Sequence, residues 1–418
     1  MALPCGIALC APFVFQASTI RPRAKQKPAR KRAIVAGTGG SGHSAPEVAG
    51  GARGDRSRLP WFRLILIAIL VLTVPGLRAR RIKGFSATPP VGEALAEFGE
   101  CQGLLLAWDN DLTEPQYRVL TDIVRHARNR LEVCLLVADE SQKHSAATTL
   151  RQAGVSPAHV SFVVVPLRKT WARDFGPVFV KAADGRHEML DFVYSPTTLP
   201  HLNAEDRVPQ GLASALAMPV TEVPLALDGG NLLSNGQGLL VTSEATLKDN
   251  PRRTKEEVSQ TLRHYVGAQQ VVFLEPLYLE RTGHVDVFCT FTSPDTVLVG
   301  RYEDHEDEVN AAILDRNAQR LAKVRTPHGP LRVERITMPR RGPNKRFWSY
   351  TNVVYANGLV LVPVYPELPA QLNEAALATF RRLLPTWEVV GIDATPLMEL
   401  DGALHCATAN LYRLGPEK

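Results

Sequence analysis

The chain has 418 residues, of which 45% are hydrophobic and 22% are charged, and its formal net charge is +6. This composition is typical of a globular protein and excludes a fibrous or wholly disordered chain. Much of the positive charge is concentrated between Arg21 and Arg32, and the rest of the chain is close to neutral. Because phosphate binding needs a basic face on the folded body, we expect no nucleic-acid partner.

The cysteines show no C-x-x-C pair and no histidine spacing typical of zinc. We therefore expect neither a metal site nor a disulfide framework. Three of them, Cys101, Cys134 and Cys289, lie in apolar runs typical of strands and are expected to be inert core thiols. The remaining three are Cys5, Cys10 and Cys406.

The first 88 residues differ in character from the rest. Residues 1–58 are rich in Ala, Gly, Arg, Lys and Pro without apolar periodicity, so we expect them to be disordered. Residues 59–88 contain a basic flank, an apolar run over 64–74 and a Pro-Gly turn, a pattern typical of a signal peptide. The run is shorter than the roughly 20 residues that span a bilayer, which favours a cleaved signal.

A signal anchor with membrane contact through 64–77 and a buried core segment are the alternatives. The internal position of the segment suggests a translation start further along the chain. We expect an exported (periplasmic or secreted) or membrane-anchored protein rather than a cytoplasmic one.

From about Pro89 to the end, short apolar strands alternate with amphipathic helices, which predicts an α/β catalytic domain over 89–418. The clearest helix is predicted over 114–128, with Thr113 as its cap and Pro115 in its first turn. Strands are predicted over 104–108, 133–137, 160–165 and 271–274.

A weak internal repeat appears in three turn-then-strand units. Leu240, Leu298 and Leu361 occupy corresponding positions at intervals of roughly 60 residues, and a predicted helix and another strand follow each unit. Several similar α/β modules arranged in a ring fit this period.

Reactive residue types stand beside glycine in four short segments, each expected in a loop at a strand end. Together they supply a thiol, an imidazole and three carboxylates. The segments are W-A-R-D-F-G-P at 171–177, D-G-G-N at 228–231, G-H-V-D at 283–286 and D-G-A-L-H-C-A-T at 401–408.

The order and spacing of these segments resemble the guanidine-modifying superfamily, specifically its agmatine deiminase and bacterial peptidyl-arginine deiminase branch. The resemblance runs from about Phe98 to Asn410 and includes S-Y-T-N at 349–352 and the N-G turn and strand over 357–365. It implies a pentein fold, a five-bladed α/β propeller with pseudo-fivefold symmetry and the site in its central channel.

The resemblance also implies roles for individual residues. Cys406 would be the nucleophile, His284 the acid and base, and Asp174 and Asp286 the carboxylates that bind a guanidinium. Asp228 stands where many relatives have Glu, so its contact with the site is an open question.

Other residues in the matching segments allow two interpretations. Trp171 stacks on the substrate or packs into the core, and Asn352 hydrogen-bonds near the site or stabilises its turn. Arg173 is expected to be structural. His405, next to the nucleophile, is expected to point away from it if the local chain is extended.

The chemistry suits these residue types. Carboxylates can grip the planar N–H fork of a guanidinium, and a bound cation favours the thiolate of Cys406. The thiolate would attack the guanidinium carbon, and His284 would first protonate the departing ammonia and then deprotonate water. No step needs a metal or a cofactor, and G-H-V-D alone is too sparse for the manganese site of other guanidine hydrolases.

The substrate is expected to be a small-molecule or peptide guanidine. The segment over 191–198 has neither the Asn-x-Trp-Gly stretch of relatives that act on agmatine nor the paired arginines of the secreted peptidyl-arginine type. Agmatine is expected first and peptidyl-arginine close behind. An amidinotransferase and an inactive guanidine-binding relative are the rival classes, and the sequence gives no indication of oligomeric state.

Overall fold

The computed structural model describes residues 91–194, 204–303, 305–342 and 346–412. The extension predicted over 1–58, the signal segment over 59–88 and its apolar stretch over 64–77 lie outside these residues. No described helix is both long and apolar enough to cross a bilayer.

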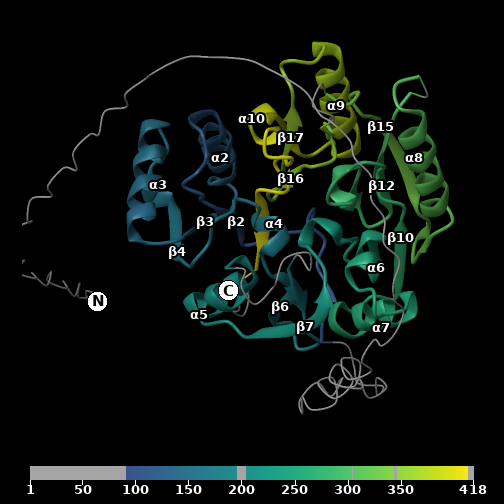
Figure 1. Ribbon diagram of the computed structural model, residues 1–418, viewed down its shortest axis with the longest axis horizontal. Helices are drawn as coiled ribbons and strands as arrows, with labels where there is room; N and C mark the ends of the chain where they lie inside the picture. The colour runs from purple at the N-terminus through teal and green to yellow at the C-terminus, as the bar shows by residue number, and fades with distance from the viewer. Residues whose placement is uncertain (1–90, 195–203, 304, 343–345, 413–418) are drawn as a thin grey trace, which may run out of the picture. The chain divides into compact units, whose positions relative to one another are not determined.

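Five sheets of three or four strands repeat one connection: an antiparallel pair, a helical crossover, and a parallel neighbour (Figure 1). In three of these modules all the elements come from one uninterrupted stretch of the chain, and in the second of them a small two-stranded ribbon lies between the helix and the last strand. They are β8 (Leu233–Ser234), β9 (Leu239–Ser243), α6 (Ala245–Asp249), α7 (Lys255–Val266) and β10 (Gln270–Leu274); β11 (Cys289–Ser293), β12 (Thr296–Arg301), α8 (Glu308–Leu321) and β15 (Arg332–Thr337); and β16 (Val354–Tyr355), β17 (Leu359–Val364), α9 (Ala370–Leu383) and β18 (Glu388–Asp393).

The other two modules take a strand from elsewhere in the chain. The strand order is β1, β5, β6, β7 in one sheet and β19, β2, β3, β4 in the other. The first contains β1 (Glu93–Ala94), β5 (Val178–Lys181), β6 (His187–Val193), η3 (Glu205–Arg207), α5 (Val208–Leu216) and β7 (Val220–Ala226). The second contains β2 (Gly103–Ala107), α2 (Glu114–Ala127), β3 (Glu132–Val137), α3 (Glu140–Gln152), η1 (Pro157–His159), β4 (Val160–Val164) and β19 (Thr408–Leu411).

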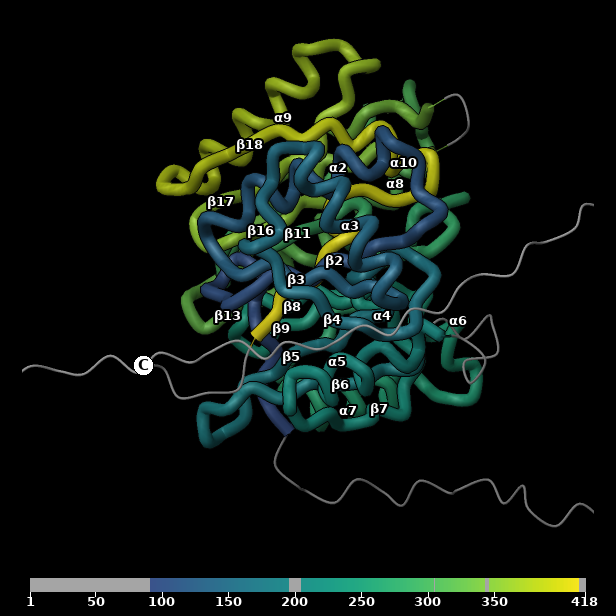
Figure 2. Tube along the Cα trace, turned by 90° about the vertical axis from the view of Figure 1, so that its left-hand side faces the viewer, coloured from purple at the N-terminus to yellow at the C-terminus, as the bar shows by residue number. Residues whose placement is uncertain are grey.

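The strand β19 comes from the far end of the described chain and closes the module of β2, β3 and β4, which is called the first module because its β2 comes first along the chain after β1. It pairs antiparallel with β2, so that Thr408 lies opposite Leu106 and Leu411 opposite Gly103. Figure 2 shows this yellow strand among the blue strands of the first module. A small ribbon of β13 (Arg325–Thr326) and β14 (Gly329–Pro330) lies in the connection before β15.

The strongest predictions from the sequence are confirmed. The helix predicted over 114–128 is α2, which ends one residue earlier because Arg128 is its C-cap. Its N-terminus is stabilised by the side chain of Gln116, which accepts a 2.8 Å hydrogen bond from the backbone N–H of Thr113. The four predicted strands are β2, β3, β4 and β10, and the three repeat units are the hairpins that open the uninterrupted modules.

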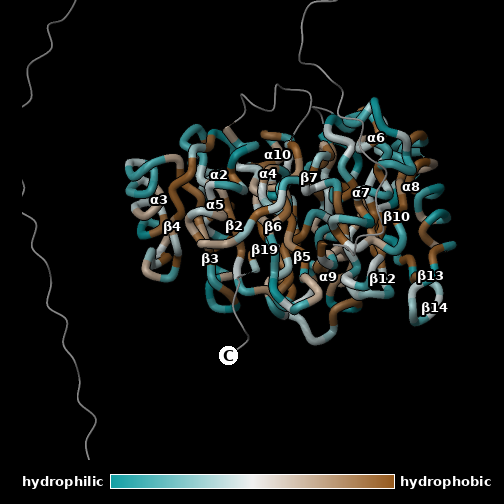
Figure 3. The backbone as a smooth tube through the Cα atoms, turned by 90° about the horizontal axis from the view of Figure 1, so that it is seen from below, coloured by the Kyte–Doolittle hydropathy of each residue, from teal (hydrophilic) through white to brown (hydrophobic). Residues whose placement is uncertain are grey.

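Burial follows the strands. The described strands carry many of the fully buried side chains, among them Leu104 to Leu106 in β2 and Val297 to Val299 in β12. Figure 3 shows hydrophobic stretches along the strands and hydrophilic ones toward the outer loops. This apolar framework holds the segments at the strand ends rigidly.

A short turn stands just before the opening strand of every module. The turns are α4 (Ala172–Phe175) before β5, η4 (Gly229–Asn231) before β8, η5 (Val285–Val287) before β11, the turn at 349–352 before β16, and the turn at 404–407 before β19. The remaining helix, α10 (Thr395–Met398), precedes the last of them. Four of these turns lie in the segments that the sequence marks as reactive, and the turn at 349–352 lies in a further segment of the resemblance. The helix α4 packs on η4, which packs on η5.

Candidate active site

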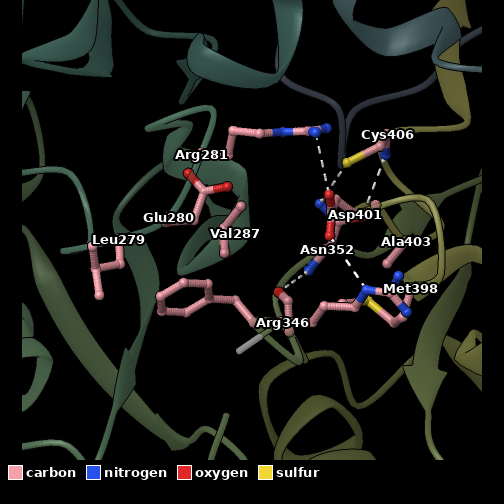
Figure 4. Close-up of a pocket in the computed structure, with 13 residues that line it drawn as sticks. Leu279, Glu280, Arg281, Val287, Arg346, Asn352, Met398, Asp401, Ala403 and Cys406 are labelled. Carbon is pink, nitrogen blue, oxygen red and sulfur yellow. Dashed lines mark hydrogen bonds and ion pairs between the residues drawn. The ribbon is translucent and has the colours of Figure 1, made fainter. Parts of the chain in front are cut away.

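The turns bring most of the predicted site residues to one cavity of about 490 Å³. It is lined by Trp171, Asp174, Asp228, His284, Asp286 and Cys406. Asn352 lines an adjoining cavity of about 220 Å³, which Cys406 also borders (Figure 4). Segments more than 200 residues apart in sequence therefore meet around one thiol.

The imidazole of His284 lies between two carboxylates. Its Nδ1 is 3.5 Å from Oδ1 of Asp174, and its Nε2 is 3.4 Å from Oδ2 of Asp228. Asp228 thus reaches the histidine despite having a shorter side chain than Glu, which answers the question raised by the sequence.

Gly230 in η4 permits the close approach of Asp174 to His284. The backbone N–H of Gly230 donates a 3.2 Å hydrogen bond to Oδ1 of Asp174. A Cβ atom at this position would lie 2.7 Å from both Oδ1 of Asp174 and Nδ1 of His284. Glycine is therefore required here for steric reasons.

The electrostatics of the cavity favour a cation. Burial opposes the charging of His284, but Asp174, Asp228 and Asp286 together raise its pKa to about 10. Burial raises the pKa of Asp174 to about 7, and the neighbouring carboxylates add to this rise while His284 opposes it. The cavity is lined by five carboxylates, which include Asp249 and Asp401, and by Lys169, Arg281 and His284. Even with His284 charged, this leaves an excess of negative charge that a bound cation would offset.

The thiol of Cys406 is buried beside acids and an amide. Nδ2 of Asn352 donates to its Sγ at 3.4 Å, and Oδ2 of Asp286 lies 3.8 Å from the same Sγ. Burial, Asp286 and Asp174 raise the pKa of this thiol well above its ordinary value. This rise in pKa favours the protonated thiol, and a bound cation would favour the thiolate.

Asn352 combines the two roles that the sequence left open. Its Oδ1 accepts from the backbone N–H of His405 at 2.9 Å and from that of Cys406 at 3.3 Å. The same side chain therefore shapes the turn that carries Cys406 and faces its sulfur.

Trp171 also serves two purposes. Its indole borders the larger cavity and packs against Gly402, where any Cβ atom would collide with the ring. The tryptophan thereby supports the turn that leads to Cys406. Among the described residues, no group of three or more His, Cys, Asp or Glu side chains has a geometry suited to a metal ion.

Comparison with known proteins identifies the family. The chain matches the model of Porphyromonas-type peptidyl-arginine deiminases over residues 93–411. The chain belongs to this family. Its members and relatives are hydrolases that act on C–N bonds.

Individual relatives are distant. A Shewanella baltica protein named "Putative agmatine deiminase" is 26% identical over 293 residues, which cover 62% of this chain and 77% of that protein. The crystal structure of an arginine deiminase homologue from Porphyromonas gingivalis is 25% identical, covers 76% of this chain and 97% of its own, and gives a TM-score of 0.66. The agmatine deiminase of Enterococcus faecalis shares the fold, with 20% identity, coverage of 78% and 99%, and a TM-score of 0.69.

The expectation for His405 depended on an extended local chain, which this family member does not have there. His405 lies in a turn rather than an extended segment, and its Nδ1 is 2.8 Å from Oδ2 of Asp286. Its Nε2 is 2.7 Å from Oε2 of Glu97, a residue that the sequence did not single out. Arg173, expected to be structural, forms a 2.7 Å ion pair with the same glutamate.

Proposed function

We propose that the protein is a cysteine-dependent deiminase that converts a guanidinium group to a ureido group and releases ammonia. The observation that carries this proposal is the placement of a buried thiol in one cavity with three carboxylates and an imidazole. Such a cavity favours a cation, and the guanidinium is the cation whose central carbon a thiolate can attack.

In this proposal Asp174 and Asp286 bind the guanidinium. Each can accept N–H donors from the planar fork, and charge-assisted bonds of this kind contribute about 1.5–3 kcal/mol each. Oδ1 of Asp286 is buried without a hydrogen-bond partner among the described residues, so this carboxylate has acceptor capacity left for a substrate.

The reaction then follows from the charges. The bound guanidinium favours ionisation of Cys406, whose thiol proton is released to solvent, and the thiolate Sγ then attacks the central carbon. His284, protonated at neutral pH because of its raised pKa, gives its proton to the departing amine, which leaves as ammonia. A thiouronium remains on Cys406.

The second half of the reaction reverses the role of the histidine. Neutral His284 takes a proton from water, the oxygen adds to the thiouronium carbon, and the C–S bond breaks. As the C=O bond of the ureido product forms, the hydroxyl proton of the tetrahedral adduct passes to solvent or to the released ammonia, and the thiolate and the imidazolium are both regenerated. Asn352 donates to Sγ and so stabilises its negative charge in both halves.

Agmatine is the first substrate that we propose, with N-carbamoylputrescine as its product. The names of the Shewanella and Enterococcus relatives support it. Peptidyl-arginine, giving citrulline, is the second, supported by the family match. Arg281 and Arg346 also favour a peptide substrate, because arginine side chains bind carboxylates and both border the smaller cavity. Each lies 3.4 Å from Asp401 (Figure 4).

The test is to measure ureido product and ammonia from agmatine, free arginine and arginine peptides. Cys406→Ala is the inactive control, and Cys289→Ala is the matched cysteine control in the core. Product that depends on Cys406 supports the deiminase. A folded protein that forms no product from any guanidine would contradict it, and product formed only with an added amine acceptor would indicate an amidinotransferase.

We further propose that the five modules form a five-bladed α/β propeller with pseudo-fivefold symmetry. The repeated topology and the equivalent position of the five turns support this arrangement. An experimental structure in which the modules do not superpose by successive rotations about one axis would refute it.

Export is proposed from the basic and apolar pattern over 59–88. Expression of the full chain followed by cell fractionation tests it. A protein found in the cytoplasm with this segment uncleaved would contradict it.

A further inference from the structure

A buried chain of alternating charges runs behind the carboxylate that lies nearest the nucleophile. Arg173 pairs with Glu97 at 2.7 Å, Glu97 with Nε2 of His405 at 2.7 Å, and Nδ1 of His405 with Asp286 at 2.8 Å. Oδ2 of Asp286 is the same atom that lies 3.8 Å from Sγ of Cys406. The mechanism above uses only the last carboxylate and leaves the other three groups without a role.

Both ring nitrogens of His405 face carboxylates, which accept hydrogen bonds when ionised. An imidazole can donate from both nitrogens only as the imidazolium. Burial and Arg173 oppose this charge, but Glu97 and Asp286 outweigh them and raise the pKa of His405 above its ordinary value. Burial also opposes the charge on Glu97, yet Arg173 and His405 lower its pKa to about 2.

The contact decides how Asp286 can meet a substrate. A carboxylate with no fixed partner can rotate about its Cβ–Cγ bond, so its oxygens have no set direction toward a substrate. The negative charges of two such acids also repel a neighbouring thiolate. His405 holds Oδ2 with a short bond, and its side chain is only 3% exposed, so water does not compete. Oδ1 remains without a partner among the described residues.

We infer that His405, anchored by Glu97, is a positioning residue that fixes the orientation of Asp286 for guanidinium binding and offsets the carboxylate charge beside Cys406. This inference rests on the proposed function. It assigns the Arg173–Glu97 pair the task of fixing His405 from the side away from the cavity.

Two substitutions separate the two bonds of His405. In His405→Asn the amide nitrogen lies near the position of Nδ1 and can still donate to Asp286. In His405→Gln it lies near the position of Nε2 and can donate only to Glu97. Both substitutions remove the charge and the ring, so their packing losses are comparable. The difference in ligand affinity between the two variants therefore reports the contact with Asp286.

The measurement is calorimetric binding of agmatine, arginine and N-acetylarginine amide to the full chain carrying Cys406→Ala, with each variant added. For the tightest ligand we expect His405→Gln to raise Kd at least about 10-fold above that of His405→Asn, which corresponds to losing one charge-assisted hydrogen bond. In the protein with Cys406 intact, KM should rise in the same order, by more than kcat falls.

Equal Kd values in two variants of equal Tm would overturn the inference, because a purely structural role predicts losses that follow stability. If either variant does not fold, Glu97→Gln replaces it. That change keeps an acceptor for Nε2 but removes the anchoring charge, and we expect Kd to rise about threefold with little change in Tm. An unchanged Kd in Glu97→Gln would then overturn the inference.

The outcomes also separate this inference from the proposed function. If guanidines bind with the predicted order but the protein with Cys406 intact releases no ammonia, the deiminase proposal fails and the positioning role stands. If none of the three ligands binds, both fail.

Discussion

Guanidinium binding should be coupled to the loss of a proton from Asp174. Burial and neighbouring carboxylates raise the pKa of this acid to about 7, and a bound guanidinium would lower it again by direct charge pairing. Below pH 7 the acid must therefore lose a proton before it can pair, whereas above pH 7 it is already ionised. Affinity should fall as pH decreases through 7 and be nearly constant above it.

The size of the effect follows from linkage. One proton released per ligand weakens binding about tenfold, or about 1.4 kcal/mol, for each pH unit below the pKa. Between pH 8 and pH 5.5 the Kd of agmatine for Cys406→Ala should rise roughly 30-fold. Adding Asp174→Asn should weaken binding roughly 10- to 100-fold at pH 8, through loss of the charge-assisted bonds, and remove most of the pH dependence.

Titration calorimetry in two buffers of different ionisation enthalpy measures both the affinity and the proton count. Close to one proton should be released per ligand near pH 6 and close to none near pH 8.5. Asp191→Asn is the matched control, because burial also raises the pKa of Asp191 to about 7 but this residue does not line the cavity. Equal affinity at pH 5.5 and pH 8, with no buffer dependence, would refute the reasoning.

Three further substitutions test the framework of the site. Gly230→Ala should reduce kcat/KM by more than about 100-fold while Tm changes little, since the new methyl group collides with Asp174; near-normal turnover would show that the acid can move freely. Gly402→Ala should reduce both Tm and turnover, because the methyl group would displace Trp171, and an unchanged melting curve would argue against this packing. Cys289→Ala should cost roughly 1–2 kcal/mol of unfolding free energy through a small cavity and leave kcat/KM unaltered; a selective loss of activity in folded protein would contradict its assignment as an inert thiol.

The sequence predicted the local elements and the repeated hairpins because both depend on short-range patterns. The helix α2 has caps and an apolar face within 15 residues, and the turns at 235–238 and 357–358 carry the glycines that tight hairpins need. The modules closed by β1 and β19 did not appear as repeats, since each takes a strand from a distant part of the chain. No periodicity within a segment reveals such a pairing.

The residues of the candidate site also divide into those that a short sequence pattern reveals and those that depend on distant parts of the chain. Asp174, Asp228 and His284 were recognisable because each lies in a short glycine-containing segment, and the fold brings the segments together. The orientation of His405 depended on whether the chain around it is extended, and the turn found there brings its ring between Asp286 and Glu97. Glu97 carried no local signal, because only the docking of β19 places its partner beside it.

The pairing of β19 with β2 also determines when the protein can become active. A chain emerging from the ribosome carries its acids and His284 long before Cys406, the nucleophile that we propose, and Cys406 takes its place only after β19 docks on β2. In the proposed mechanism the nascent chain therefore cannot modify its own arginines or those of neighbouring chains before that docking. A chain truncated before Thr408 would lack β19 and would be inactive. It would also leave one edge of β2 unpaired, and an unpaired strand edge promotes aggregation. The strand β19 therefore links catalysis to completion of the fold.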